Sequence, residues 1–135
     1  MSSYRREVVR LRVPFHDCDP MSIVWHGNYL KYFEHARMAL FHACALDVPM
    51  IRDLGYKMVV ADTRVRFTHP SSYGEEIEVS AKTAATEPLL KIVYSVRNLT
   101  RDRRSARGNT VLAITRFDDT LFHGTPPQIA ERLRV

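Results

Sequence analysis

The chain has 135 residues, a length in the usual range for one domain with a modest core of its own. Hydrophobic residues make up 45% and charged residues 26% of the chain, which excludes a disordered protein, and no apolar run approaches the length of a membrane span. The formal net charge of +5 favours anionic partners such as phosphates, nucleotides or nucleic acid, without indicating a fold.

The first predicted element is a half-buried strand over Glu7–Val13, in which apolar residues alternate with arginines. The segment before it contains no apolar core of signal-peptide length, so we expect a cytoplasmic protein. Pro14 ends the strand, and an acidic loop follows as far as Ser22. With only two cysteines, Cys18 and Cys44, the chain has neither a disulfide framework nor a CxxC metal spacing.

A helical pattern follows Asn28, because apolar residues recur at i, i+3 and i+4 spacing. The residues with this spacing are Tyr29, Phe33, Ala36, Leu40 and Ala43. Other faces of the same helix also carry large apolar side chains, and a helix that is apolar nearly all round is a buried one. We therefore expect it to lie in the centre of the domain, with Pro49 ending it.

From Lys57 onward the apolar period changes from that of a helix to two residues, which is the period of a strand. Four strands are predicted in succession, over residues 57–67, 76–86, 90–99 and 110–118. The polar segment Thr100–Asn109 carries four arginines and is predicted to be the connection of a hairpin. One or two helical turns are expected over Gln128–Arg134.

No internal repeat or linker is found, so a single domain over residues 1–135 is predicted. The order of a strand, a long helix and four consecutive strands favours an α+β fold, with a five-stranded antiparallel sheet and the helix on one face. One helix covers only one face of such a sheet. The other face, or an edge, must meet solvent or another subunit, and we therefore expect an oligomer.

Two carboxylates, Asp17 and Asp19, flank Cys18 in the acidic loop. Such a pair could bind a hard metal, act as a general base or nucleophile, or accept hydrogen bonds from the amides of a turn. A metal needs more oxygen ligands than this loop supplies, so no metal and no redox cofactor is expected. The two aspartates raise the pKa of the Cys18 thiol and thus disfavour the thiolate nucleophile.

The residues Trp25, His26 and Gly27 lead directly into the predicted helix. A helix N-terminus has unpaired amides and a partial positive charge, and such donors can stabilise the oxyanion that forms when a carbonyl is attacked. A carboxylate just upstream can attack the carbonyl or activate water. The His26 side chain could orient a substrate or move a proton near neutral pH, or it could only cap and pack.

Two further groups of charged residues allow both a structural and a functional interpretation. Glu34 and Arg37 are spaced for a local ion pair on the helix, and the alternative is a second acid that faces the site. The arginines between Arg97 and Arg107 lack the interleaved aromatic residues of single-strand nucleic-acid binders. They are a solvated hairpin tip or, if functional, a site for a compact polyphosphate.

The acidic loop, Asp17-Cys18-Asp19-Pro20 followed by Ile23-Val24-Trp25, resembles the active-site loop of the 4-hydroxybenzoyl-CoA thioesterases of the hotdog fold. Its continuation, His26-x-Asn28-Tyr29-Leu30 and Phe33-Glu34-x-Ala36-Arg37, resembles the related acyl-CoA thioesterases associated with the Tol-Pal system. The resemblance covers residues 8–118, and its motif over residues 15–37 is long enough to be specific.

This resemblance implies that Asp19 is the catalytic carboxylate and that the backbone amide of His26 is the oxyanion donor. It also implies a sheet that wraps around the helix, dimers formed through the sheets with sites at the dimer interface, and pairing of dimers into tetramers. Basic side chains are expected to hold the phosphates of CoA. The residues expected to contact substrate are Trp25, Gly27, Asn28, Tyr29, Glu34, Arg66 and Arg104.

One departure from the family lies at Met21-Ser22, where many relatives have a glycine-rich step that allows close approach to the ligand. This departure bears on the acyl group more than on the reaction. We predict the hydrolysis of an acyl-CoA, whose thiol leaving group, with a pKa of about 8.5, needs little acid assistance. The alternatives are an acyl carrier protein thioesterase, a hydroxyacyl-thioester dehydratase, a non-catalytic acyl-CoA binding module, and an RNA-binding domain that uses the arginine loop.

Overall fold

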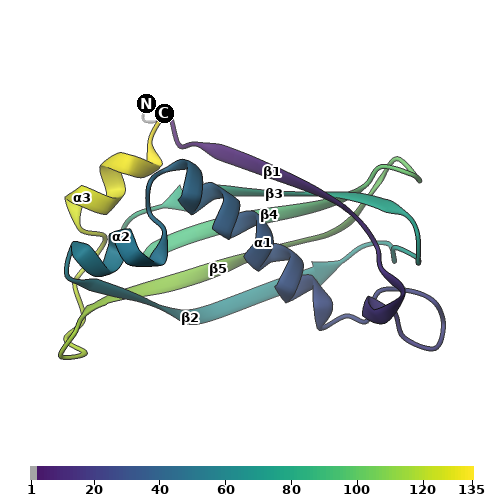
Figure 1. Cartoon of the computed structure of the whole chain (residues 1–135), viewed down its shortest axis with the longest axis horizontal. Helices are drawn as coiled ribbons and strands as arrows, with labels where there is room; N and C mark the ends of the chain where they lie inside the picture. The colour runs from purple at the N-terminus through teal and green to yellow at the C-terminus, as the bar shows by residue number, and fades with distance from the viewer. Residues whose placement is uncertain (1–2) are drawn as a thin grey trace.

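The computed structural model describes residues 3–135, so that Met1 and Ser2 of the predicted domain lie outside the described residues. The elements follow the predicted order (Figure 1). They are β1 (Arg6–Arg12), η1 (Phe15–Asp17), α1 (Asn28–Ala43), α2 (Val48–Asp53), β2 (Tyr56–Phe67), β3 (Glu76–Ala85), β4 (Leu90–Asn98), β5 (Arg103–Arg116), α3 (Pro127–Ala130) and η2 (Glu131–Leu133). Among these residues, none of the helices has the length and apolar character needed to span a membrane.

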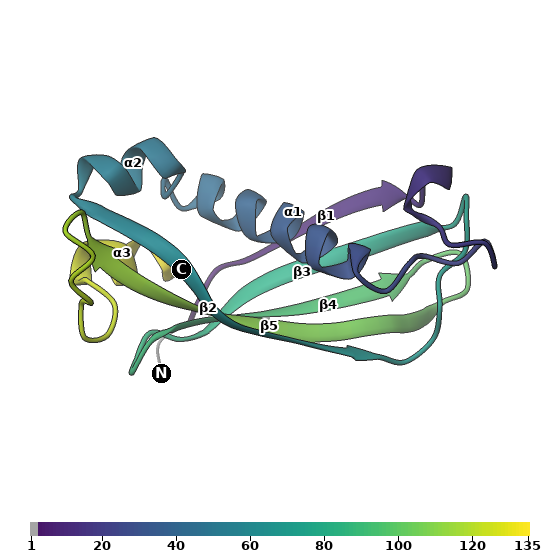
Figure 2. The ribbon, with the colours of Figure 1, turned by 90° about the horizontal axis from the view of Figure 1, so that it is seen from below.

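The five strands form one antiparallel sheet in the order β1-β3-β4-β5-β2. β1 and β2 are therefore the two edges, although they are the first two strands in the sequence. Helix α1 runs along one face of this sheet, as the view from below shows (Figure 2). The sheet curves around the helix, and the predicted α+β hotdog fold is confirmed.

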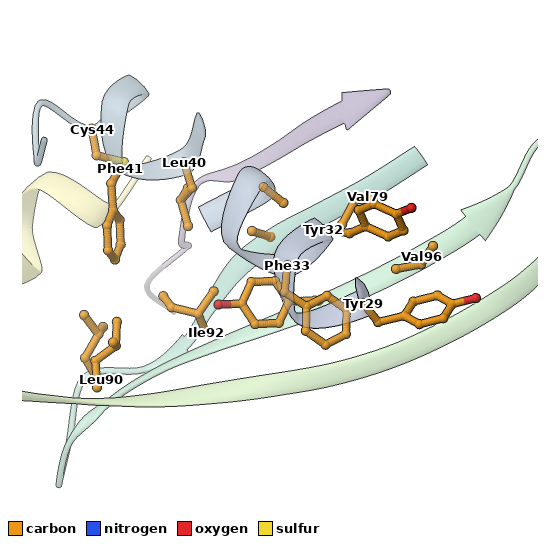
Figure 3. Close-up of a cluster of buried hydrophobic side chains, with 14 of the residues drawn as sticks. Tyr29, Tyr32, Phe33, Leu40, Phe41, Cys44, Val79, Leu90, Ile92 and Val96 are labelled. Carbon is orange, nitrogen blue, oxygen red and sulfur yellow. The ribbon is translucent and has the colours of Figure 1, made fainter. Parts of the chain in front are cut away.

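The core lies between α1 and the sheet, and it explains how α1 is oriented. Tyr29, Tyr32 and Phe33 extend from α1 towards the strands and are buried (Figure 3). The opposite stripe of the helix is not covered, because Leu30 is 44% and Met38 61% exposed. The prediction that α1 is buried on nearly all its faces is thus corrected for the single chain.

Glycine at position 108 allows α1 to approach the sheet closely. A Cβ atom there would lie 2.6 Å from the ring of Phe33 and still closer to the main-chain oxygen of Arg64 on the neighbouring strand. Without it, the ring of Phe33 lies over this glycine and stacks on Tyr94, with 4.5 Å between ring centroids and 5° between planes. This contact fixes the N-terminal half of α1 over β4 and β5.

The segment Thr100–Asn109 was predicted to be a hairpin connection, and a hairpin does join β4 to β5 here, but the connection is shorter than predicted because β5 already begins at Arg103. Pairing of β4 with β5 continues to the partners Asn98 and Arg103, and Asp102 turns the chain with a φ of 53°. Backbone pairing outweighed the polar character of the segment. Three of its four arginines, Arg103, Arg104 and Arg107, consequently belong to a strand and not to a loop tip.

Candidate active site

The acidic loop closes into a tight turn around Asp19. The amide of Ser22 donates to the main-chain oxygen of Asp19 at 2.9 Å, and the amide of Met21 donates to the carboxylate oxygen Oδ1 at 2.8 Å. Within residues 3–135 the second carboxylate oxygen, Oδ2, accepts no hydrogen bond from another residue. The side chain of Asp19 is thus oriented by the turn and still has one oxygen available for chemistry.

The turn requires a left-handed backbone at Ser22, whose φ is 63°. This is the region that glycine adopts readily and that L-residues enter at a cost. The loop therefore keeps a glycine-like conformation at the Met21-Ser22 step without having the glycine. The departure seen in the sequence changes the side chains of the turn and leaves its backbone path glycine-like.

Asp17 has a different environment, since it is buried, with 3% of its surface exposed. Its Oδ2 accepts a hydrogen bond from the hydroxyl of Tyr32 at 2.7 Å, and its Oδ1 pairs with the ammonium group of Lys31. Burial alone raises the pKa of the Asp17 carboxyl, but the hydrogen bonds from Lys31 and Tyr32 outweigh burial and leave the pKa below its usual range. Burial and the neighbouring Asp17 together raise the pKa of Tyr32.

The main-chain oxygen of Asp17 also fixes the start of α1. It accepts hydrogen bonds from the amide of Trp25 at 2.9 Å and from the side-chain amide of Asn28 at 2.8 Å. The amide of Asn28 donates to the oxygen of Trp25. In the part of the chain that the structure describes, the amides of His26 and Gly27, which lie between these donors, have no acceptor. Two unpaired N–H groups therefore remain at the N-terminus of a 16-residue helix.

Asp19 and His26 line one cleft of about 310 Å³. Its other lining residues are Ile23, Val24, Tyr29, Phe67, Thr68, His69 and Pro70. The rings of Tyr29 and Phe67 meet edge to face, with 5.4 Å between centroids, and the ring of His26 lies 6.3 Å from Phe67. The cleft thus brings together Asp19, whose carboxylate has a free oxygen, and His26 at the start of α1, with apolar and aromatic side chains around them.

This arrangement suits an attack on a carbonyl group. The free oxygen of Asp19 can act as a nucleophile or take a proton from water. The amides at the start of α1 can stabilise the negative charge that forms on the carbonyl oxygen. Among residues 3–135, no three His, Cys, Asp or Glu side chains are grouped so that they could hold a metal ion.

Of the other residues predicted at the start of the helix, only Tyr29 lines the cleft. Trp25 is 51% exposed, and its ring lies over Gly27 and beside His26, with 4.9 Å between ring centroids. Asn28 uses its side chain to hold the loop at Asp17. These residues shape the helix start from outside the cleft.

The predicted pair of Glu34 and Arg37 is not formed among the described residues. Arg37 instead donates to the hydroxyl of Tyr94 at 3.4 Å, and Glu34 is exposed. Both lie on the wall of a separate cavity of about 730 Å³ between α1, α2 and β2. The Glu34 carboxylate therefore does not join Asp19 within one chain.

The predicted phosphate-binding arginines also lie away from the Asp19 cleft. Arg66 pairs with Arg107 across β2 and β5, and with Arg64 they line a groove of about 520 Å³. Arg104 is exposed opposite Arg97. Their neighbour Gly108 faces α1, and strand alternation therefore places Arg107 on the opposite face of the sheet.

Sequence reasoning missed the far wall of the cleft, formed by Phe67–Pro70. This segment was predicted to be the end of a strand and a turn, and nothing in its composition marks it as part of a site. Only the fold brings it to the acidic loop, through a bridge between Ile23 and Ser72. A histidine and a proline directly after a long strand are a weak signal, which turns share in general.

Comparison with known proteins adds an independent observation. The family model of the thioesterase-like superfamily matches residues 13–133. The acyl-CoA thioesterase YbgC of Helicobacter pylori is 28% identical over 86 residues, which are 64% of this chain and 62% of that protein. The matches to the first curated relatives span 56% and 62% of those relatives' own lengths.

Solved structures show the same architecture. A thioesterase from Thermus thermophilus, complexed with coenzyme A and Zn, superimposes with a TM-score of 0.77 at 25% identity, over 98% of this chain and 95% of that one. A variant of 4-hydroxybenzoyl CoA thioesterase complexed with 4-hydroxybenzoyl CoA gives a TM-score of 0.84 at 20% identity, over 96% and 99% of the two chains. At the lower identity the likeness concerns the fold alone.

Proposed function

We propose that this chain, which belongs to the thioesterase-like superfamily, hydrolyses an acyl-CoA thioester to a free acid and CoA. The observation that carries the proposal is one cleft lined by both Asp19, whose carboxylate has an uncommitted oxygen, and His26 at the helix start. Among the described residues, the amides of His26 and its neighbour Gly27 have no acceptor. Relatives named acyl-CoA thioesterase and a neighbour complexed with coenzyme A support the choice of substrate.

In the proposed reaction, the thioester carbonyl oxygen points to the amides at the start of α1. Asp19 either attacks the carbonyl carbon, forming an acyl-aspartate that water then hydrolyses, or takes a proton from a water molecule that attacks. In both routes the C–S bond breaks and CoA leaves as a thiolate. A thiol pKa of about 8.5 makes this leaving group stable enough to depart without a strong acid.

The cleft also limits the acyl group. Its volume of about 310 Å³ lies at the lower end of the usual range for small-molecule pockets, roughly 300–1,000 Å³. Tyr29 and Phe67 supply flat apolar walls. We infer that the cleft receives the reacting end of the acyl group and that the nucleotide part of CoA lies outside it.

A homo-oligomer completes the proposal. Glu34, Arg66 and Arg104 do not line the cleft of their own chain, so they could reach the acyl group in a cleft only from a second copy. The edge strand β2 carries exposed Val59 and Val60 and an unpaired backbone edge, which pairing with a second copy would cover. We propose a dimer or dimer of dimers of one-domain chains, residues 1–135, located in the cytoplasm.

The test is a panel of short-chain, long-chain and aromatic acyl-CoAs, together with an acyl carrier protein thioester. Free thiol is followed with a thiol-reactive dye and the acid by mass spectrometry. We expect thiol and acid in equal amounts from at least one acyl-CoA. A changed acyl group without thiol release would indicate a dehydratase, and saturable binding without turnover on any substrate would indicate a binding module.

A further inference from the structure

The Asp19 loop rests on a set of buried polar side chains that the proposed reaction does not use. Ser71, Asn98 and Ser105 have at most 1% of their surface exposed, and Glu75 has 9%. They come from the segment after β2, the end of β4 and the start of β5. Buried polar groups are costly unless they are paired, and a fully paired set holds its neighbours in one arrangement.

The hydrogen bonds of this set have a fixed direction. The side-chain nitrogen of Asn98 donates to Ser71 Oγ at 3.1 Å and to Glu75 Oε1 at 3.0 Å. Ser105 Oγ donates to the main-chain oxygen of His69 at 2.7 Å. A hydroxyl has one proton, so Ser71 must be the donor in its 2.5 Å contact with Ser105. The bonds therefore run from Asn98 through Ser71 and Ser105 to the wall of the cleft.

At the other end of the set, Glu75 connects the buried side chains to Arg101 at the surface. Its carboxylate accepts hydrogen bonds from Arg101 Nε at 2.8 Å and from the amide of Ser72 at 2.6 Å, in addition to that from Asn98. Burial alone raises the pKa of the Glu75 carboxyl, but these hydrogen bonds outweigh burial and leave the pKa below its usual range. Glu75 is therefore held as a carboxylate that fixes both Ser72 and Asn98.

Ser71 connects this set to the catalytic loop. Its main-chain oxygen accepts the amide of Val24 at 2.9 Å, and the amide of Tyr73 donates to the oxygen of Ser22 at 3.0 Å. Asp19 is connected to the same segment, because its amide donates to the oxygen of Ile23, the residue before Val24, at 2.8 Å. Any shift of Ser71 therefore moves the turn that carries the Asp19 carboxylate.

Ser105 acts on the opposite wall. It holds the main-chain oxygen of His69, whose neighbours Thr68 and Pro70 line the cleft, and it lies 3.4 Å from the hydroxyl of Tyr29. The amide of Thr68 donates to the main-chain oxygen of Ser105 at 2.9 Å. The contact between Ser71 and Ser105 thus connects two parts of the cleft: the turn that carries the Asp19 carboxylate, and the opposite wall at His69.

We propose that Ser71 and Ser105 are positioning residues, which set the distance between the Asp19 carboxylate and a carbonyl group held at the start of α1. The inference rests on the proposed thioesterase function. Reactions of bound groups depend steeply on geometry, and a misplacement of about 1 Å can lower a rate by about 100-fold. Loss of the serine pair is therefore expected to lower kcat, while binding of the distant parts of CoA persists.

The test compares Ser105→Ala with Thr125→Val. Thr125 is also buried and donates its hydroxyl to a main-chain oxygen, that of Thr86, at the same distance of 2.7 Å. It precedes α3, which lies at the end of the molecule opposite the Asp19 loop (Figure 1). Thr125→Val loses one buried hydroxyl–carbonyl bond, whereas Ser105→Ala loses such a bond and also removes the contacts of Ser105 with Ser71 and Tyr29. We therefore expect Ser105→Ala to lower Tm more, and kcat is measured at the same interval below the Tm of each variant. Only Ser105→Ala should lower kcat, by about 10- to 100-fold with KM changed less.

Glu75→Gln is the second variant, for the case in which Ser105→Ala folds poorly. It keeps an acceptor for Ser72 and Asn98 but places an NH₂ group opposite the N–H of Arg101 Nε, so that only the bond with Arg101 is lost. A smaller fall in kcat than in Ser105→Ala is therefore expected. The inference is overturned if kcat, measured at the same interval below each Tm, falls by the same factor in Ser105→Ala and Thr125→Val. It is also overturned if kcat in Glu75→Gln equals that of the wild type.

A second readout separates this inference from the proposed function. Amide hydrogen exchange of the peptide over residues 15–27 should become faster in Ser105→Ala and stay unchanged in Thr125→Val. If the wild type hydrolyses no acyl-CoA, faster exchange in Ser105→Ala would still support the anchoring role, while the thioesterase proposal would be overturned. Unchanged exchange in both variants would overturn the anchoring role even where the enzyme is active.

Discussion

Asp19→Asn is the substitution that tests the proposed reaction with the least disturbance of the fold. Asparagine has the same shape as aspartate, and its Oδ1 can still accept the hydrogen bond from Met21 that orients the side chain at 2.8 Å. The change removes the negative charge and replaces the uncommitted carboxylate oxygen by an NH₂ group. Because the turn keeps its bonds, the free energy of unfolding should change by less than about 0.5 kcal/mol.

The expected effect on the rate follows from the role of the free oxygen. A general base contributes about 10²- to 10⁴-fold to a rate, and each tenfold corresponds to about 1.4 kcal/mol of activation free energy. We therefore expect kcat to fall by at least about 100-fold, which is a loss of roughly 3 kcal/mol of transition-state stabilisation. KM should change little, because the amide keeps the shape of the cleft.

The matched control is Asp17→Asn, which makes the same chemical change two residues earlier. An asparagine at this position can accept from the hydroxyl of Tyr32, but it no longer neutralises Lys31. We expect a loss of stability of about 1–3 kcal/mol, with kcat of the folded fraction reduced less than in Asp19→Asn. Release of thiol from the preferred acyl-CoA, at saturating substrate and well below Tm, is the assay. If Asp19→Asn kept kcat within about tenfold of the wild type, less than a general base contributes, the assignment of Asp19 would be refuted.

Three further predictions concern stability. Ser22→Gly relieves a residue with a φ of 63° and should raise stability by up to about 1 kcal/mol in urea denaturation, whereas Ser22→Ala should not. Gly108→Ala should cost about 1–3 kcal/mol or more, since the added Cβ would collide with the main-chain oxygen of Arg64, and wild-type stability would contradict the packing described. The pKa values of Asp17 and Glu75 are lowered by folding, so the stability they contribute is present above about pH 4 and is lost as the pH falls through their folded pKa values. The urea midpoint should accordingly fall on acidification, and it should fall less steeply in Asp17→Asn, while an equal slope would contradict the environment of Asp17.

The order of the elements could be predicted from the sequence because each one has its own period. Alternation of two residues and helical spacing are local signals, and they located α1 and the strands, apart from the start of β5, to within a few residues. The start of β5 was missed for a physical reason. Its buried positions there are Ser105 and Ala106, which are small or polar, so the strand lacks the apolar alternation that marks the others. β1 pairs with β3, although α1, α2 and β2 lie between them in the sequence, and no local pattern in the sequence indicates this pairing.

The same distinction applies to the candidate site. Asp19 and His26 are seven residues apart in the sequence, and one loop carries both to the cleft. Because the motif is local, both residues could be predicted from the sequence. The wall at Phe67–Pro70 and the serine pair beneath it come together only through strand pairing. For Glu34 a local pattern suggested a contact that the fold does not make. Its i, i+3 spacing to Arg37 is compatible with an ion pair, but Arg37 instead donates to the hydroxyl of Tyr94.

The two aspartates of the loop differ in how many of their oxygens are already committed. Asp17 uses both carboxylate oxygens for Lys31 and Tyr32, and it could not reach a carbonyl carbon without leaving these partners unpaired. Its main-chain oxygen accepts hydrogen bonds from Trp25 and Asn28, on either side of two amides that have no acceptor in the described part of the chain. In the proposed reaction the buried acid thus holds the helix start whose amides would bind the oxyanion, and Asp19, which keeps one free oxygen, would make the attack. Exchanging the two environments would require moving the turn, and this is the reason why the proposed reaction uses Asp19 and not Asp17.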